Sequence, residues 1–160
     1  MPQYLYQLQQ ETQEKRMIGI TQPRRVAAVN LASRVASEMG RGKPGVGPVG
    51  YRVRFDEKMG PATRIKFLTD GMLLREAILD KSLRQYSTII LDEAHERTAN
   101  SDVLLALLKG IVAGERANDL KLVIMSATLD LAKFTAYFGA DTLVRVEGRT
   151  FPIEVYNTRM

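Results

Sequence analysis

The sequence has no cysteine and no long apolar run. Without cysteine, disulfide bonds and thiolate metal sites are excluded, and the chain fits a reducing compartment. No stretch approaches the roughly 20 consecutive apolar residues that a membrane-spanning helix needs. Residues 1–15 (MPQYLYQLQQETQEK) are polar and lack the apolar centre of a signal peptide. We therefore expect neither a disulfide-stabilised secreted fold nor a membrane partner.

The composition that remains is typical of one soluble globular domain. The 160 residues are 45% hydrophobic and 26% charged, which is enough apolar surface for a core and is unlike a disordered chain. There are 23 Lys and Arg residues against 18 Asp and Glu residues, so the net charge is +5. Such an excess favours a polyanionic partner only mildly, because many soluble proteins carry it without binding nucleic acid.

Short apolar runs alternate along the chain with longer segments of helical periodicity. Strands are predicted at residues 17–21, 51–55, 65–68, 88–91, 122–125, 143–146 and 153–156, and helices at 21–39, 69–79, 101–112 and 131–138. Thr21 and Asp70 are the predicted caps of the first two helices. This alternation predicts an α/β fold with a mostly parallel sheet flanked by helices. The apolar runs IIL and LVIM are typical of strands covered on both faces.

Two acids and the only histidine follow one of the predicted strands. Residues 87–97 read STIILDEAHER, so Asp92 and Glu93 stand where the strand ends and His95 comes two residues later. Ligands of open α/β sheets bind outside the carboxyl ends of the strands. In nucleotide hydrolases an acid at this place holds Mg²⁺, and a neighbouring residue orients the attacking water. The alternative is that the two acids only cap a turn and that the histidine is structural, since short patterns of this kind also arise by chance.

Three further segments follow other predicted strands and favour the first interpretation. Residues 21–28 read TQPRRVAA, residues 69–76 read TDGMLLRE and residues 126–128 read SAT. With DEAHER (92–97) between the second and the third of them, the segments resemble motifs Ia, Ib, II and III of the DEAH-box RNA helicases of superfamily 2, in that order and with similar spacing. The resemblance is to the first RecA-like domain of that family, a fold of the P-loop NTPase type, and it runs from Pro2 to about Thr158.

For the nucleotide side of the site, the resemblance implies one role for each matching residue. Asp92 would hold Mg²⁺ together with Glu93, and Glu93 would also activate the hydrolytic water. His95 would be a catalytic coupling residue that senses a facing second RecA-like domain. Ser126 and Thr128 would link the state of the nucleotide to domain movement and to the grip on RNA.

For the RNA side of the site, the resemblance implies contacts with the sugar–phosphate backbone. Arg24 and Arg25 would bind phosphates through charge-assisted hydrogen bonds. Thr69, Asp70 and Gly71 would do the same at the start of a helix. Such contacts do not read bases, and the few phosphates touched predict weak and strongly salt-dependent binding. The alternative for the two arginines is a solvated helix start.

The family's phosphate-binding loop, G-x-x-x-x-G-K-[ST] (Walker A), does not occur in this chain. The nearest substitute is residues 40–45 (GRGKPG). It fails because Ser37 stands in place of the first glycine and Pro44 in place of the Ser or Thr that would ligate Mg²⁺, so we interpret it as a connecting loop. In the family, this motif and the first strand of the sheet precede the segment that here begins PQYL. The sheet is therefore expected to lack that strand and to have a gap or an unprotected edge.

These matches predict that residues 1–160 are a partial first RecA-like domain, without the second RecA-like and C-terminal domains. The parent protein would be an ATP-dependent RNA helicase that uses ATP and Mg²⁺ for RNA unwinding or ribonucleoprotein remodelling. This fragment alone is expected to bind neither cofactor tightly and to be inactive. The alternatives are a non-catalytic RNA-binding or interaction module that keeps the fold without the motor, and a DNA helicase of the wider superfamily.

Partners and location follow only from the resemblance. RNA is the expected partner, and a glycine-rich activator protein would dock on the absent domains. The resemblance implies a nuclear or nucleolar protein, with the cytoplasm as the alternative.

Overall fold

The computed structural model describes residues 1–40, 42–127, 131–139, 142–146, 148 and 154. The chain divides into two compact units, Met1–Leu129 and Asp130–Met160. In the second unit, the predicted helix is confirmed as α5 (Leu131–Phe138). The strand predicted at 143–146 is wrong, because these residues have no regular structure and no described strand completes their backbone hydrogen bonds. Of the strand predicted at 153–156, only Glu154 is described.

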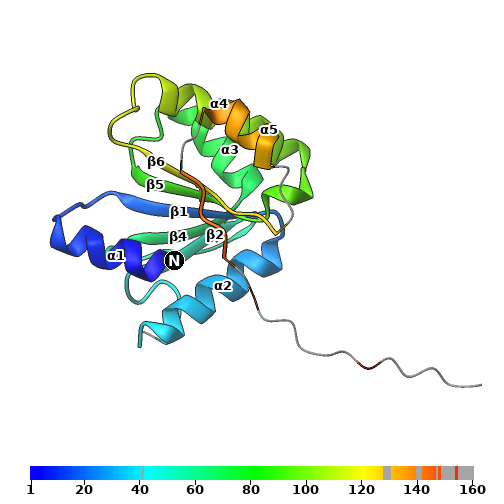
Figure 1. The fold of residues 1–160 in the computed structure, drawn as a ribbon. Coiled ribbons are helices and arrows are strands. Elements are labelled where there is room, and N and C mark those ends of the chain that lie inside the picture. Colours follow the sequence, from blue (N-terminus) through cyan, green and yellow to red (C-terminus); the bar gives the residue numbers. More distant parts are fainter. Residues whose placement is uncertain (41, 128–130, 140–141, 147, 149–153, 155–160) are drawn as a thin grey trace, which may run out of the picture. The chain divides into compact units, whose positions relative to one another are not determined.

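The first unit is built on a six-stranded sheet in the order β3–β2–β4–β1–β5–β6 (Figure 1). The strands are β1 (Met17–Gln22), β2 (Val49–Val53), β3 (Asp56–Lys58), β4 (Ile65–Thr69), β5 (Tyr86–Leu91) and β6 (Lys121–Ile124). All neighbouring pairs are parallel except the β2–β3 hairpin. The predicted α/β fold with a mostly parallel sheet is therefore confirmed, while β3 has no counterpart among the predicted strands.

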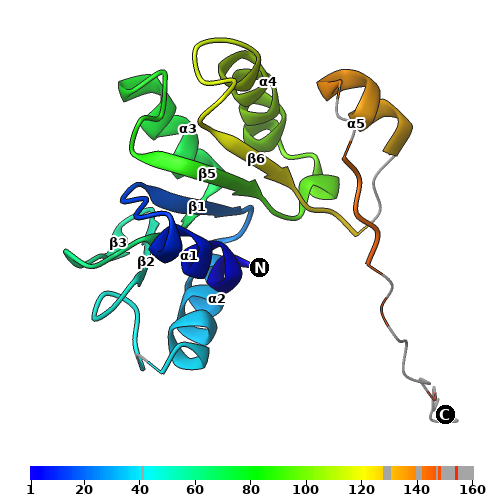
Figure 2. The same cartoon turned by 60° about the vertical axis from the view of Figure 1, so that its left-hand side comes forward.

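Helices cover the two faces of this sheet (Figure 1, Figure 2). On one face lie α1 (Pro2–Glu11), which the sequence analysis did not predict, and α2 (Arg25–Glu38); on the other face α3 (Asp70–Leu79) packs against α4 (Ala99–Ala113). The layers are therefore helix, sheet and helix, as in doubly wound α/β proteins. Within the described residues, no helix combines the length and apolar character needed to cross a bilayer.

The helical spacing of Val26, Val29, Ala32, Ala36 and Met39 predicts the face that α2 turns to the sheet, and all of these residues except Val26 lie in or against the core. Ala28, Ala32, Val35 and Ala36 are buried, whereas Val26 is 71% exposed. The helix begins at Arg25, later than predicted, because Thr21 and Gln22 still belong to β1 and pair with Leu68 and Thr69 of β4. The helix therefore starts only after the strand has ended, and Thr21 is a strand residue instead of a cap.

The two strands predicted to be covered on both faces differ in burial. Every residue of β5 is buried, but β6 is exposed at its first residue and only partly buried at the other three. The reason is position in the sheet, since β5 lies between β1 and β6 while no described strand pairs with the outer side of β6. The expectation for LVIM is therefore not met in this unit.

A buried ion pair attaches α3 to the middle of the sheet. The Nζ of Lys66 lies 2.6 Å from Oε1 of Glu76, and the Tyr86 hydroxyl donates to the other oxygen at 2.6 Å. Burial is the main cause that raises the pKa of Tyr86 well above its usual range. A Cβ on Gly19 would lie 2.8 Å from the Tyr86 ring. Only glycine therefore leaves space at this point of β1 for the ring that completes the cluster.

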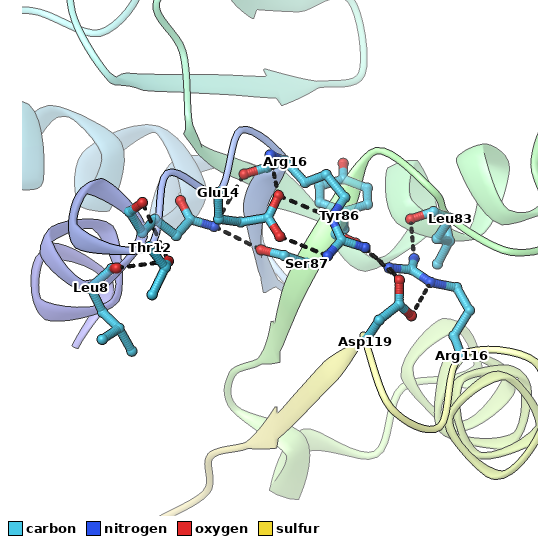
Figure 3. Close-up of polar contacts among 10 residues, drawn as sticks. Leu8, Thr12, Glu14, Arg16, Leu83, Tyr86, Ser87, Arg116 and Asp119 are labelled. Atoms are coloured by element: carbon cyan, nitrogen blue, oxygen red, sulfur yellow. Dashed lines mark hydrogen bonds and ion pairs between the residues drawn. The ribbon is translucent and has the colours of Figure 1, made fainter.

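At the amino edge of the sheet, one buried guanidinium joins two connections of the chain (Figure 3). Arg116, 4% exposed, donates to the carbonyl oxygens of Leu83 and Tyr86 at 2.7 Å each and to Asp119 at 2.9 Å. The guanidinium fork thus satisfies carbonyls of the turn that leads into β5 and fixes the loop that leads into β6. These residues lie at the opposite end of the strands from the predicted site.

The same edge carries a second arginine bound to two acids (Figure 3). Arg16 lies 2.5 Å from Asp119 and 2.7 Å from Glu14. The side-chain hydrogen bond from Arg16 is the main cause that lowers the pKa of Glu14 from 4.5 to about 2. The segment between α1 and β1 is therefore held to the loop before β6 by charge-assisted bonds.

We expect that Arg116→Lys lowers the free energy of unfolding by about 2 kcal/mol, because an ammonium group cannot reproduce the fork and leaves buried carbonyl oxygens without donors. Urea denaturation measures this loss. Arg34→Lys is the matched control, since the Arg34 side chain is 75% exposed and bonds the exposed Glu38. Equal effects of the two substitutions would contradict the structural role of Arg116.

The lowered pKa of Glu14 predicts an acid-dependent loss of stability. A carboxyl group whose pKa is lower in the folded state stabilises that state above its ordinary pKa and loses this contribution as the pH falls through the folded value. The urea concentration at the unfolding midpoint should therefore decrease as the pH is lowered from about 4.5 to about 2. Glu14→Gln should make this decrease smaller. An unchanged pH profile in the variant would contradict the assignment.

Candidate active site at the carboxyl edge of the sheet

The four sequence segments that suggested a site all follow parallel strands of one sheet. The ends of these strands are aligned, since Thr21 pairs with Leu91, Gln22 with Thr69, and Leu91 with Ile124. The segments after β1, β4, β5 and β6 therefore begin at the same edge of the sheet. This edge is where ligands bind in open α/β folds.

Asp92, the first residue after β5, is held on both carboxylate oxygens. Its Oδ1 accepts the backbone N–H of Glu93 at 2.9 Å, and its Oδ2 accepts the side-chain amide of Gln22 from the end of β1. Gln22 was not among the predicted site residues, although it lies in the predicted segment 21–28. The Gln22 side chain is buried, so the carboxylate of Asp92 is held by a buried neighbour.

Glu93 occupies a strained backbone conformation. Its φ of 55° and ψ of 35° are left-handed, which costs a residue with a Cβ roughly 1–2 kcal/mol. The turn is held by the bond from Glu93 to Asp92 and by the N–H of Ala94, which donates to the carbonyl of Met125 at 3.1 Å. The Glu93 side chain is 43% exposed, so water can reach its carboxylate. Strain of this kind, held in place by neighbouring strands, is found at functional sites.

His95 connects the acidic loop to the segment after β6. Its Nδ1 accepts the N–H of Ala127 at 3.4 Å, and its Nε2 lies 3.3 Å from the carboxylate of Glu93. The hydroxyl of Ser126 is buried and has no hydrogen-bond partner among the described residues. Thr128 lies outside the described residues. The imidazole therefore contacts both a predicted catalytic acid and the Ser-Ala-Thr segment.

The two arginines lie at the start of α2, directly after β1. Arg24 is the N-cap residue, with its side chain 76% exposed, and Arg25 is the first helical residue and also exposed. The guanidinium of Arg24 lies 3.2 Å from Oε1 of Glu96. Glu96 was also missed by the sequence prediction, although it belongs to the DEAHER segment. Both missed contacts arise because β1 and β5 are neighbours in the sheet, and a single sequence does not reveal that pairing.

The segment after β4 corrects one prediction. Thr69 is the N-cap residue of α3, and neither its side chain nor that of Asp70 caps the helix; Asp70 is the first helical residue and is 4% exposed. Burial raises the pKa of Asp70, and the hydroxyls of Thr21 and Thr98 partly oppose that rise. A Cβ on Gly71 would lie 3.3 Å from the side-chain nitrogen of Asn100. Asp70, which was predicted to cap the helix, is therefore a buried residue of the first helical turn.

The residues at this edge fit the ligand preference of Mg²⁺. Asp92 and Glu93 supply two carboxylates, and each oxygen of Asp92 keeps a further lone pair beside the one that already accepts a hydrogen bond. No cluster of three or more metal-ligating side chains occurs in the part of the chain that the structure describes. Mg²⁺ is commonly held by only one or two carboxylates, with water and substrate phosphates completing its shell.

Residues 42–45 of the glycine-containing segment lie at the other edge of the sheet from these carboxylates. The segment joins the end of α2 to the start of β2, and β2 runs parallel to β4. It therefore enters the sheet at the amino edge, whereas the segments described above leave it at the carboxyl edge. Gly45 donates its N–H to the carbonyl of Val49 at 2.8 Å, which closes the connecting turn.

No protein-family model matches the chain, but curated relatives cover nearly all of it. The probable ATP-dependent RNA helicase DHR2 of Saccharomyces cerevisiae is 48% identical over 156 residues, which are 98% of this chain and 21% of the relative. The pre-mRNA-splicing factor ATP-dependent RNA helicase prp22 of Schizosaccharomyces pombe is 49% identical over 148 residues, 92% of this chain and 12% of the relative. The chain's homologues, at about 48% identity over nearly its whole length, are thus DEAH-box ATP-dependent RNA helicases, and the chain matches a short part of each.

A mammalian relative extends this comparison. The human ATP-dependent RNA helicase DHX33 is 48% identical over 165 residues, which are 99% of this chain and 22% of the relative. The chain thus spans between 12% and 22% of the length of these three relatives. The chain therefore corresponds to a short part of each relative, and the functions in the relatives' names belong to far longer proteins.

The left-handed turn at Glu93 yields a prediction about stability. Glu93→Gly should be more stable than Glu93→Ala by about 1 kcal/mol, because glycine adopts a positive φ without the steric cost of a Cβ. Both variants lose the carboxylate, so their comparison in urea denaturation isolates the backbone conformation. Equal stability, or a more stable alanine variant, would contradict the turn seen here.

Proposed function

We propose that this chain is part of the motor core of an ATP-dependent RNA helicase, in which ATP hydrolysis is coupled to RNA unwinding or ribonucleoprotein remodelling. The observation that carries the proposal is the bonding of the acidic loop, residues 92–97, to both of its neighbours. Gln22 contacts it from the end of β1, Arg24 contacts it from the start of α2, and Ala127 contacts it from the segment after β6. The loop is thus in a position to pass a change at a nucleotide to the segments on either side.

On the nucleotide side, we assign the two acids different tasks. Asp92, held by Gln22 and by its own turn, would be a fixed ligand of Mg²⁺ with Glu93 beside it. The exposed carboxylate of Glu93 would accept a proton from the attacking water as a general base. When bound with ATP, Mg²⁺ supplies charge neutralisation to the phosphates. The chain's own contribution is therefore to fix one carboxylate and to leave the other accessible to water.

We assign the coupling role to His95 with Ser126 and Thr128. The support for His95 is its position between Glu93 and the N–H of Ala127. The support for Ser126 is its buried hydroxyl, which lacks a partner within the described residues and would gain a hydrogen bond if the neighbouring segment moved. Unpaired buried hydroxyls cost free energy and so favour states in which they are paired.

RNA contact is assigned to the exposed arginines at the start of α2 and to the partly buried turn at the start of α3. Arg24 and Arg25 would bind backbone phosphates, and Thr69 with the turn at Gly71 would offer backbone N–H groups at a helix N-terminus. Asp70 would support this turn from below, because its carboxylate is buried. Binding of this kind depends on the phosphates and not on the base sequence.

The same proposal extends to the organisation of the parent protein. Residues 1–160 would be part of a first RecA-like domain that works against a second one, with a phosphate-binding loop supplied from outside this sequence. A glycine-rich activator would act on further domains. A nuclear or nucleolar location agrees with the pre-mRNA-splicing factor among the relatives, and a cytoplasmic location is the alternative.

The proposal is tested by placing residues 1–127 in the yeast relative DHR2 in exchange for the corresponding segment. The chimera should hydrolyse ATP in an RNA-stimulated manner, and Glu93→Gln should lower turnover by at least about 100-fold, the contribution of a general base. A phosphate-release assay measures both. The isolated chain should show no ATPase activity, because it has no G-x-x-x-x-G-K-[ST] sequence to bind the phosphates.

Two results would contradict these assignments. RNA-stimulated turnover by the isolated chain, abolished by Glu93→Gln, would show that the phosphate-binding loop is dispensable. A chimera that binds RNA but hydrolyses no ATP, with or without Glu93, would favour the non-catalytic RNA-binding module. Glu11→Gln serves as the matched control in both assays, because Glu11 is exposed and lies outside the site.

A further inference from the structure

The exposed guanidinium of Arg24 is already occupied by a carboxylate. Its Nη2 lies 3.2 Å from Oε1 of Glu96 in the short 3₁₀ helix Ala94–Glu96. The two residues are far apart in sequence and meet because β1 and β5 are neighbours. A guanidinium binds carboxylate and phosphate through the same fork of N–H donors. A phosphate that approaches Arg24 therefore meets a group whose donors are partly engaged.

Arg25 differs from Arg24 in this respect. It is exposed on the next position of the chain, yet in the described part of the structure no carboxylate forms an ion pair with it. The two arginines carry the same charge and lie at the same helix start. The structure thus contains a natural comparison between a paired and an unpaired arginine.

Releasing Arg24 would have a cost on the other side of the pair. The Glu96 side chain is only 28% exposed, and its charge raises the pKa of the buried Asp70. Without Arg24, two neighbouring carboxylates at the base of the RNA-facing turns would lose a compensating positive charge. Like charges in a partly buried setting disfavour each other, so the pair resists transfer of Arg24 to a phosphate.

We propose that Glu96 is an internal competitor for Arg24, a carboxylate that holds this arginine in the absence of RNA and gives it up when a backbone phosphate binds. The inference rests on the proposed RNA contact of Arg24. It adds a positioning residue that sets the strength of that contact. Because Glu96 belongs to the same loop as Asp92 and Glu93, it links the grip on RNA to the loop that carries the acids.

The test is a double-mutant cycle on the whole chain with a fluorescein-labelled uridine dodecanucleotide at low salt, read by fluorescence anisotropy. Glu96→Gln should raise the affinity about threefold, the size expected for a solvent-exposed ion pair. Arg24→Gln should weaken binding, and in the Arg24→Gln background the gain from Glu96→Gln should disappear. In the Arg25→Gln background the gain should persist, because Arg25 does not share its donors with Glu96.

Two controls separate competition from other effects. Glu11→Gln removes one negative charge from an exposed position away from the site, and its effect on affinity gives the contribution of net charge alone. Thermal melts by circular dichroism verify that each variant is folded. Should Glu96→Gln fold poorly, Glu96→Ser enters the same cycle in its place.

The outcomes distinguish this inference from the function on which it rests. If the chain binds RNA and weakens on loss of Arg24, but Glu96→Gln gains no more than Glu11→Gln, the competitor role is overturned and the RNA contact stands. A gain that survives without Arg24 overturns it equally. If neither arginine matters for binding, or the chain does not bind the oligonucleotide, both the proposed RNA contact and the competitor role fail.

Discussion

Parallel pairing of β1 with β4 and β5 is the constraint on which the site depends. Parallel strands that are in register must end at the same edge of a sheet, and here Gln22 is level with Thr69 while Thr21 is level with Leu91. The chain crosses back over the sheet between these strands through α2 and α3. Segments far apart in sequence therefore meet at one edge because of strand pairing alone, without direct contacts between the segments being required.

The two edges of the sheet are stabilised in different ways. At the amino edge and in the centre, buried charged groups are paired, as for Arg116 with its carbonyls and for Lys66 with Glu76. Breaking such contacts is costly because the remaining partner stays buried and unpaired. At the carboxyl edge, the ion pair of Arg24 is exposed, Glu93 is in a left-handed turn and the Ser126 hydroxyl lacks a partner within the described residues. A part of the unit in which buried charges are paired thus supports an edge where several polar groups are exposed or lack a partner within the described residues.

The elements with strong periodicity were predicted from the sequence, and the errors have local physical causes. β4, β5 and α5 agree with their apolar patterns to within a few residues. The start of α2 was placed too early, because Pro23 and Thr21 resemble a helix start although Thr21 and Gln22 are drawn into the sheet by β4. Asp70 was taken as a cap from its residue type, whereas burial between neighbouring segments decides its environment. The partial exposure of β6 depends on its place at the end of the strand order.

By itself, the sequence determined the α/β class, the resemblance to DEAH-box RNA helicases and which candidate site segments follow strands, because these depend on periodicity and on motifs that are local in the chain. Only the tertiary structure decided which side chains share partners. The bond from Gln22 to Asp92 and the pairing of Arg24 with Glu96 join residues about 70 positions apart. Such contacts arise from strand order, and strand order is set by packing of the whole sheet, which no local pattern contains.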